Sequence, residues 1–155
     1  FDNALLKARA LVAKAPSGAW VLADDSGLEV DALGGAPGVR SARYASEAGD
    51  AEANNRKLLR ALEGVPETER RARFVCVLVL CPVEGEPYSF EGRCEGSIGD
   101  RASGNGGFGY DPLFLPSGFG KSFAELGSGI KNRLSHRSQA LARLAAFLGE
   151  SRFSR

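Results

Sequence analysis

The chain has 155 residues, of which 43% are hydrophobic and 25% charged, as in an ordinary globular domain with a sizeable core. The formal net charge is +1 and the Lys and Arg residues are dispersed, so we expect no nucleic-acid groove. One histidine excludes a two-histidine zinc site, and no apolar run approaches a membrane span.

The three cysteines fall in strand-like sequence at Cys76, Cys81 and Cys94. An odd number at these positions is typical of small buried hydrophobic residues, not of a disulfide framework or a metal site. No secretory signal is evident. We therefore expect a reducing, cytoplasmic environment.

The first segment, Asn3–Lys14, is expected to form an amphipathic helix because its apolar residues recur at helical spacing. Lys7 lies at the border of that apolar stripe, where a long stem can carry the ammonium group into a cleft. On spacing alone, a solvated lysine is the simpler interpretation.

The second segment is a short buried strand, Trp20–Ala23, followed by Asp24, Asp25, Ser26 and Gly27. Side chains alternate faces along a strand, so two adjacent carboxylates cannot both point inward. We therefore expect a turn after the strand, with Gly27 permitting the bend. Ligands of open α/β sheets bind at such strand ends; the alternative is a solvated acidic turn.

The middle of the chain predicts the sheet. A short strand is expected over Leu28–Leu33 and a helix from Asp50 to about Glu63. The apolar run Arg71–Cys81 predicts a central strand, and Tyr88–Ile98 its hairpin partner. The loop 34–38 lacks the lysine of a phosphate-binding Walker loop. The expected fold is α/β, a central mixed, twisted sheet flanked by helices, with an antiparallel hairpin and a ligand cleft.

A glycine-rich loop, residues 104–116, carries Phe108 and Asp111. A phenylalanine among glycines is either inserted in the core or offered as a platform for a planar ligand. Asp111 precedes a proline, which favours an extended backbone, and its carboxylate can accept a hydrogen bond from a ring N–H. Local packing is the alternative interpretation.

The end of the chain combines a polar, irregular stretch through Asn132 with a final helix that Ser135 caps. His136 and Arg137 occupy its first turn, and Lys131 lies shortly before. Cations are unfavourable at a helix N-terminus, so this placement indicates a bound anion. The alternative is a poorly optimised helix start.

Together these features provide carboxylates for a divalent cation, basic groups for phosphate and an aromatic loop for a base. Oxygen ligands beside phosphates favour Mg²⁺ over zinc. No Ser–His–Asp or Cys–His nucleophile is evident. The chemistry that fits is metal-assisted attack of water on a nucleoside phosphate.

The motifs resemble one family closely. The segments NALLKA, LADDSGLEVDALGGAPGVRSARYA, GGFGYDPLFLP and KNRLSHRSQAL occur in order along the chain. In this combination they resemble the inosine/xanthosine triphosphate pyrophosphatase family. The resemblance implies a homodimeric, Mg²⁺-dependent hydrolase that cleanses the nucleotide pool. It would convert ITP, dITP and XTP to the monophosphate and pyrophosphate by attack of water at the α-phosphorus.

The resemblance also implies roles for individual residues. Asp25 would be a metal-linked carboxylate that accepts the proton of the water, and Asp24 would help to organise the metal. The implied substrate contacts are Lys7 at the phosphates, Ser26, Phe108 stacked on the base, Gly109, Tyr110 and Asp111 around it, and Lys131, His136 and Arg137. Because Arg137 only donates hydrogen bonds, it matches a C6 carbonyl and not the amino group of adenine.

One departure from the family pattern concerns the N-terminal side. Family members carry a strand, a Thr/Ser-x-Asn-x-x-Lys phosphate loop and a metal-linked glutamate before the segment that opens with Phe1 here. We therefore expect residues 1–155 to form one pyrophosphatase domain without that strand and loop. On its own this polypeptide is expected to be weakly active or inactive.

Three other functions are weighed against this one. The first is a pyrophosphatase for other modified nucleotides, such as pyrimidines. The second is a nucleotide-binding protein without turnover. The third is an RNA-binding module built on the aromatic loop, against which the near-zero net charge counts.

Overall fold

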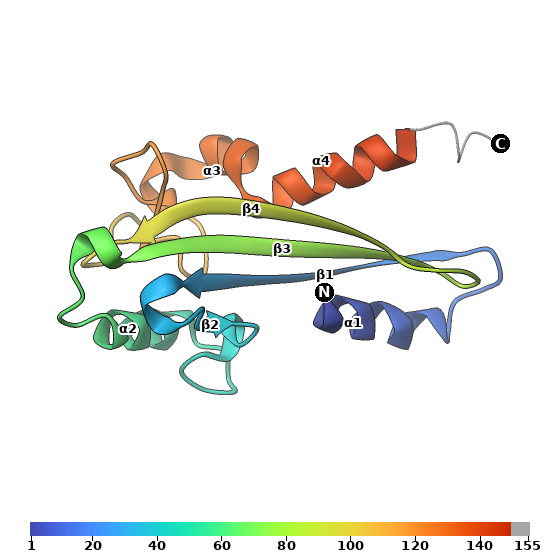
Figure 1. Ribbon diagram of the computed structural model, residues 1–155, viewed down its shortest axis with the longest axis horizontal. Coiled ribbons are helices and arrows are strands. Elements are labelled where there is room, and N and C mark those ends of the chain that lie inside the picture. Colours follow the sequence, from blue (N-terminus) through green and yellow to red (C-terminus); the bar gives the residue numbers. More distant parts are fainter. Residues whose placement is uncertain (150–155) are drawn as a thin grey trace.

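A sheet of five strands, in the order β2-β1-β3-β4-β5, separates two layers of helices in the computed structural model, which describes residues 1–149. Figure 1 shows α3 and α4 on one side of the sheet and α1 and α2 on the other. The elements are α1 (Asp2–Val12), β1 (Trp20–Val30), β2 (Pro37–Gly38), α2 (Ala51–Ala61), β3 (Arg71–Pro82), β4 (Tyr88–Ile98), β5 (Phe114–Pro116), α3 (Phe123–Leu134) and α4 (His136–Gly149), with 3₁₀ turns η1 (Asp31–Leu33), η2 (Ser41–Arg43) and η3 (Glu67–Glu69).

The sheet is antiparallel throughout the described residues. β1 pairs with β3 along its whole length, from Trp20 opposite Pro82 to Val30 opposite Ala72, and β3 forms the expected hairpin with β4. The α/β class, the flanking helices and the central position of β3 are confirmed. The parallel pairing that a mixed sheet requires does not occur between the described strands, since each of the four pairings is antiparallel.

The expected turn at Asp24–Gly27 is wrong. β1 continues through it, with Asp24 opposite Leu78 and Asp25 opposite Val77. Gly27 does not bend the chain: a Cβ atom there would lie 2.5 Å from the carbonyl oxygen of Gly38. The glycine instead lets the backbone of β2 approach the strand closely. The strand expected over Leu28–Leu33 is therefore the end of β1, followed by η1.

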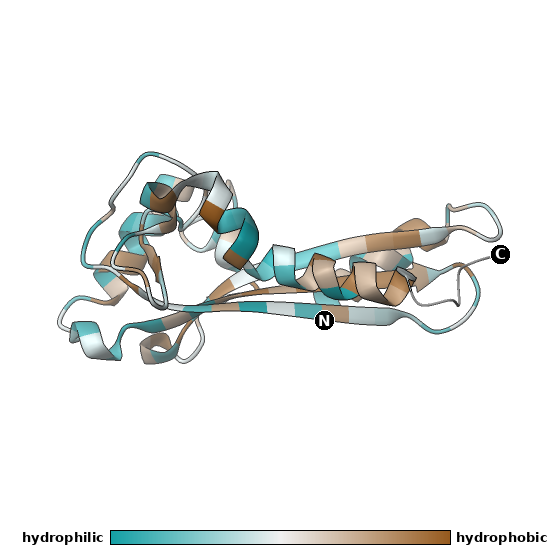
Figure 2. Ribbon diagram, turned by 90° about the horizontal axis from the view of Figure 1, so that it is seen from above, coloured by the Kyte–Doolittle hydropathy of each residue, from teal (hydrophilic) through white to brown (hydrophobic). Residues whose placement is uncertain are grey.

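Two apolar layers hold the long half of the sheet between helices. On one face, Ala4 and Ala8 of α1 pack against Ala23, Val79 and Cys81. On the other, α4 packs against alternate residues of β3, in a cluster formed by Cys76, Leu78, Leu80, Ala140 and Leu144. Figure 2 shows brown, hydrophobic residues along much of α4.

A third cluster fills the other end of the molecule and supports the site described below. Phe74 of β3 lies 4.6 Å from Phe114, and Phe114 lies 5.4 Å from Phe123, measured between ring centroids. Leu28 and Leu58 complete this part of the core and are fully buried. The aromatic rings connect β3 to the start of α3.

The polar stretch before Asn132 is not irregular, as expected from the sequence, but contains α3. Ser122 and Glu125 form a reciprocal capping box at its start, which is a sequence signature of a helix N-terminus. Gly127, with φ +77°, kinks the helix. That glycine and Gly129 interrupt the helical pattern, which explains why periodicity fails to predict α3.

Other local predictions are confirmed. The side chain of Asp50 accepts hydrogen bonds from the backbone N–H groups of Glu52 and Ala53 and caps α2. Cys76, Cys81 and Cys94 are buried free thiols. Within the described part of the chain, no helix is both long and apolar enough to cross a bilayer.

Candidate nucleotide site

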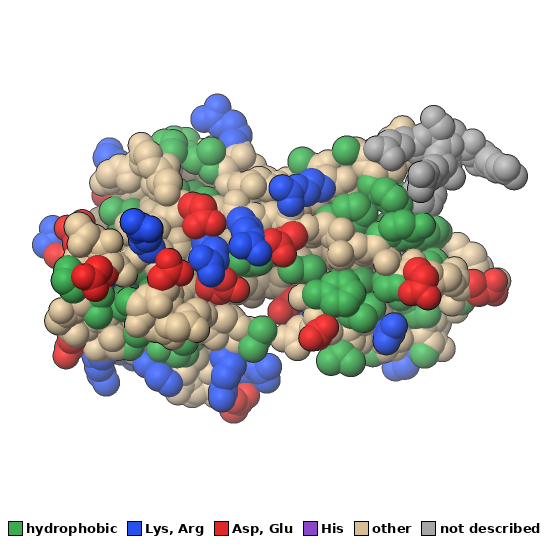
Figure 3. All heavy atoms as spheres, in the orientation of Figure 1, with side chains coloured by type: hydrophobic (Ala, Val, Ile, Leu, Met, Phe, Trp, Pro, Cys, Tyr) green, Lys and Arg blue, Asp and Glu red, His purple; other side chains and the backbone are tan. Residues whose placement is uncertain are grey.

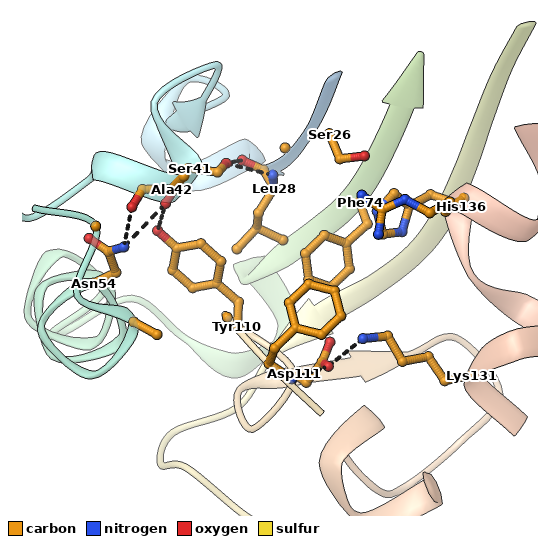
Figure 4. Close-up of a pocket in the computed structure, with 16 residues that line it drawn as sticks. Ser26, Leu28, Ser41, Ala42, Asn54, Phe74, Tyr110, Asp111, Lys131 and His136 are labelled. Atoms are coloured by element: carbon orange, nitrogen blue, oxygen red, sulfur yellow. Dashed lines mark hydrogen bonds and ion pairs between the residues drawn. The ribbon is translucent and has the colours of Figure 1, made fainter. Parts of the chain in front are cut away.

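A cavity of about 340 Å³ opens at the end of the sheet that carries α2 and α3. Its volume is within the range of small-molecule sites, roughly 300–1,000 Å³. Every predicted substrate-binding residue except Lys7 lines it: Ser26, the Phe108–Asp111 segment, Lys131, His136 and Arg137. Figure 4 shows Ser26 of β1, Tyr110 and Asp111 of the glycine-rich loop, Lys131 of α3 and His136 at the start of α4 around this space.

The Phe108–Asp111 loop is fastened by its own acidic residue. Asp111 is 1% exposed; its carboxylate accepts a 2.8 Å hydrogen bond from the backbone N–H of Phe108 and forms an ion pair with Lys131. The hydroxyl of Tyr110 donates a 2.8 Å hydrogen bond to the carbonyl of Ser41. Asp111 therefore ties the loop together, and its predicted contact with a ring N–H stays a prediction.

The ring of Phe108 is 66% exposed, so it is not inserted in the core, and the platform interpretation remains. The ammonium of Lys131 lies 3.9 Å from its centroid and 5.9 Å from that of Phe123. Such cation–π contacts hold Lys131 at the rim of the cavity. A second cavity, of about 400 Å³, adjoins the first around Phe108, Lys131 and the start of α4.

His136 is buried, with 7% of its surface exposed, and it stacks on Phe74 at 4.9 Å between centroids and 14° between ring planes. Burial lowers the pKa of its imidazole to about 4, and the positive charges of Arg137 and Lys131 act in the same direction. The ring is therefore neutral at pH 7. The expectation that His136 contributes a positive charge toward an anion is wrong.

The Nδ1 atom of His136 is buried and has no hydrogen-bond partner among the described residues, although the side chain lines both cavities. An unpaired buried polar atom is costly unless a ligand or water satisfies it. The helix start around it is otherwise ordinary: as predicted, Ser135 caps α4, its Oγ accepting from the N–H of Ser138. His136 thus offers an uncharged hydrogen-bonding group to a bound molecule.

Asp24 and Asp25 lie on opposite faces of β1, because adjacent strand residues alternate. On the α1 face, Asp25 Oδ1 accepts a 2.7 Å ion-paired hydrogen bond from Lys7 Nζ, which also donates to the carbonyl of Asp24 at 2.9 Å. On the α4 face, Asp24 Oδ2 accepts from Arg137 Nη2 at 2.9 Å. Each carboxylate therefore has its own basic partner, and neither Lys7 nor Asp25 lines the two cavities described.

Asp24 and Asp25 nevertheless directly precede Ser26, which lines the cavity, and they lie where one edge of β1 is open. β2 pairs only with Leu28 and Glu29 of β1, so among the described strands none covers that side of β1 at Asp24 and Asp25. Their side chains are 47% and 22% exposed. Figure 3 shows acidic and basic side chains intermixed across the centre of the molecule.

The acidic residues supply few metal ligands by themselves. In residues 1–149, no group of three or more His, Cys, Asp or Glu side chains is arranged to hold a metal ion. Mg²⁺ is commonly held by one or two carboxylates together with water and substrate phosphates. Asp24 and Asp25 each carry carboxylate oxygens of this kind, but they point to opposite faces of β1, so a single ion on either face meets one of the two carboxylates.

Ser41, Asn54 and Phe74 are among the residues that line the cavity and were not predicted. Asn54 is 4% exposed; its side chain accepts from the N–H of Ala45 at 2.6 Å and donates to the carbonyl of Ala42 at 3.0 Å. Asn54 lies one helical turn before the core residue Leu58, and this spacing in the sequence places it on the buried face of α2. Nothing in the sequence distinguishes Phe74 from an ordinary core residue.

Fold and site together define an α/β protein with an aromatic, cationic ligand cavity beside two edge carboxylates. The model of the Ham1 family matches residues 1–147, and the chain belongs to that family. The dITP/XTP pyrophosphatase of Opitutus terrae is 53% identical over 143 residues, which are 92% of this chain and 70% of that protein. The dITP/XTP pyrophosphatase of Geobacter sulfurreducens is 53% identical over 148 residues, 96% of this chain and 73% of that protein.

Solved structures agree with this assignment. The Ham1 protein of Staphylococcus aureus superposes with a TM-score of 0.88 at 45% identity, over 94% of this chain and 74% of that one. The nucleoside-triphosphatase, or dITP/XTP pyrophosphatase, of Mycobacterium abscessus gives a TM-score of 0.82 at 47% identity, over 95% and 74% of the two chains. The chain thus spans about three quarters of these structures.

Proposed function

We propose that the protein hydrolyses noncanonical purine nucleoside triphosphates, namely ITP, dITP and XTP, to the monophosphate and pyrophosphate. The names of the Opitutus terrae and Geobacter sulfurreducens relatives support this activity. The observation that carries it here is the cavity itself: an exposed Phe108 ring, the basic residues Lys131 and Arg137, and the neutral His136 border one space.

Recognition of the base follows from hydrogen-bonding chemistry. A guanidinium carries five N–H donors and no acceptor, and Arg137 uses one nitrogen toward Asp24. The remaining donors suit the C6 carbonyl of hypoxanthine or xanthine and mismatch the amino group of adenine. The Arg137 side chain is 43% exposed, so the selection depends on the bound base covering the guanidinium: a donor that the wrong base covers and leaves unpaired disfavours that base. The neutral imidazole of His136 can donate or accept, so it adds affinity without setting this choice.

For the chemical step, we propose that Asp25 accepts the proton of the attacking water. The water oxygen bonds to the α-phosphorus, the bond to the bridging oxygen breaks, and pyrophosphate leaves. Lys7 holds the Asp25 carboxylate in place and brings a positive charge toward the phosphates. Bound Mg²⁺ would be held by Asp25 together with water and phosphate oxygens and would supply charge neutralisation at the phosphates. Asp24 lies on the other face of β1 and would act on the site through its ion pair with Arg137.

The test is a comparison of substrates with the native gene product. Pyrophosphate release is measured with dITP, XTP, dGTP, dATP and dUTP in the presence of Mg²⁺. We expect kcat/KM for dITP and XTP to exceed that for dATP by at least about 100-fold; a site whose buried hydrogen-bonding groups are mismatched can discriminate by roughly 10⁴-fold or more. Preference for dUTP would favour a pyrimidine pyrophosphatase, and equal rates on all substrates would contradict the proposal.

A nucleotide-binding protein without turnover is the second candidate. The observation that favours it is that both carboxylates are occupied by basic side chains, Asp25 by Lys7 and Asp24 by Arg137. Calorimetric binding of dITP without release of pyrophosphate, in the presence of Mg²⁺, would identify this function. Turnover of dITP would exclude it.

Four further expectations accompany the proposal: a homodimer, a cytoplasmic location, no nucleic-acid partner and no membrane contact. Light scattering of the native gene product is expected to give twice the mass of one chain. Filter binding with RNA and single-stranded DNA is expected to show no retention, since the net charge is near zero. Cell fractionation is expected to recover the protein with cytoplasmic and not with membrane markers.

A further inference from the structure

Asn55 of α2 links that helix to the glycine-rich loop. Its Nδ2 atom donates a 3.0 Å hydrogen bond to the carbonyl oxygen of Gly109, which is 54 residues away in the chain. The Oδ1 atom of Asn55 is buried and has no partner among the described residues. The bond to Gly109 is thus the contact that fixes the orientation of this amide.

Gly109 adopts the left-handed conformation, with φ +60°, directly after Phe108. Glycine has access to several backbone regions at similar energy, so this peptide needs an external contact to stay in one of them. The neighbouring residues are held by other bonds: Phe108 N–H to Asp111, and the Tyr110 hydroxyl to Ser41. The carbonyl of Gly109 is held by Asn55.

The position of the Phe108 ring depends on this backbone. The ring is 66% exposed, so core packing does not hold it, and its described side-chain contact is the ammonium of Lys131 over one face. A rotated Gly109 peptide would move the ring relative to the cavity. Asn55 itself lines neither described cavity, so it acts on the cavity through the Gly109 peptide.

We propose that Asn55 is a positioning residue for base binding: by holding the Gly109 carbonyl, it presents the Phe108 ring to the purine. This inference rests on the proposed function in that it takes the ligand to be a nucleotide whose base stacks on Phe108. Preorganisation of this kind strengthens binding by lowering the cost of ordering the loop. It acts equally on the ground state and the transition state, so KM changes and kcat does not.

The test compares two substitutions with a control on the same helix. Asn55→Leu keeps a similar volume and removes the donor, and Asn55→Asp replaces the donor with a carboxylate that repels the Gly109 carbonyl. Arg56→Ala is the control, because Arg56 pairs on the surface with Glu52. We expect KM for dITP to rise about 2- to 10-fold in Asn55→Leu, the equivalent of one lost hydrogen bond, with kcat retained. The rise is expected to be larger in Asn55→Asp and absent in Arg56→Ala.

The readouts separate positioning from mere stability. If Asn55 only stabilises the fold, both substitutions lower Tm while KM at 25 °C stays at the native value, and the inference is wrong. If the native gene product binds dITP without releasing pyrophosphate, the proposed enzyme function fails on its own. The inference is then decided by the calorimetric Kd for dITP: weaker binding by Asn55→Leu than by Arg56→Ala supports it, and equal binding overturns it. A native protein that binds no dITP overturns both proposals.

Discussion

Protonation of His136 is predicted to destabilise the folded protein. The imidazole is buried against Phe74, and its surroundings include two positive side chains, Arg137 and Lys131. Burial is the largest cause of its lowered pKa, followed by those charges, while the carboxylate of Asp24 acts weakly in the opposite direction. Lowering the pH is therefore a perturbation aimed at one side chain of the site.

The sign and size of the effect follow from linkage. The pKa of His136 is about 4 in the folded chain and 6.5 ordinarily, so between these values the unfolded chain binds more protons. Stability therefore falls as pH falls through this window, by up to about 3 kcal/mol in total, of which about 2 kcal/mol is lost between pH 7 and pH 5.

The assay is urea unfolding at pH 7, 6 and 5, for the native protein and for His136→Phe, which keeps an aromatic ring and removes the titration. Other groups titrate in both proteins, so the difference between their pH slopes isolates His136. We expect the native protein to lose about 2 kcal/mol more than the variant between pH 7 and pH 5. Equal slopes would show that the imidazole is not buried in its neutral form, and would refute the reasoning.

The remaining predictions concern the carboxylate, base recognition, the close contact at β1 and the metal. Asp25→Asn is expected to lower kcat at least about 100-fold while moving Tm by no more than a few degrees, since its partly exposed ion pair contributes about 0–1 kcal/mol; native kcat would remove Asp25 as the base. Arg137→Lys is expected to narrow the dITP/dATP ratio of kcat/KM, because a point charge replaces a planar donor fork; an unchanged ratio would exclude Arg137 from base recognition. Gly27→Ala is expected to lower the free energy of unfolding, measured in urea, by about 1–3 kcal/mol, because the new Cβ meets the Gly38 carbonyl oxygen. Gly129→Ala is the control, since open space surrounds that position. Equal free energies of unfolding for the two variants would contradict the packing argument. Removal of Mg²⁺ by EDTA is expected to stop turnover and leave the circular dichroism spectrum unchanged, and full activity in EDTA would exclude the metal.

Much of the fold is readable from the sequence where one interaction dominates. The apolar run of β3 predicts a central strand because burial on both faces leaves few alternatives. The pair Asp24–Asp25 misleads for a physical reason. Alternation of side chains predicts a turn because two adjacent carboxylates cannot both point inward, yet an exposed strand edge can direct one carboxylate to each face when each has a basic partner. That outcome depends on Lys7 and Arg137, which lie on helices far apart in the chain.

The candidate site is likewise predictable from the sequence only in part. Residue types and motifs identify Phe108, Lys131, His136 and Arg137, and the structure gathers them around one cavity. The charge of His136 is not readable from the sequence, because it depends on burial against Phe74. Likewise, the hydrogen bond from Asn55 to Gly109 joins a residue of α2 to a loop 54 residues away, and no local sequence pattern predicts it.

The identity of the products tests the central claim most directly. Phosphorus NMR of the native gene product with dITP and Mg²⁺ is expected to show dIMP and pyrophosphate appearing together in equal amounts, with no reaction of dATP under the same conditions. Formation of dIDP and inorganic phosphate would place the attack at a different phosphorus atom, and equal conversion of dATP would show that the cavity does not select the base; either result would contradict the account.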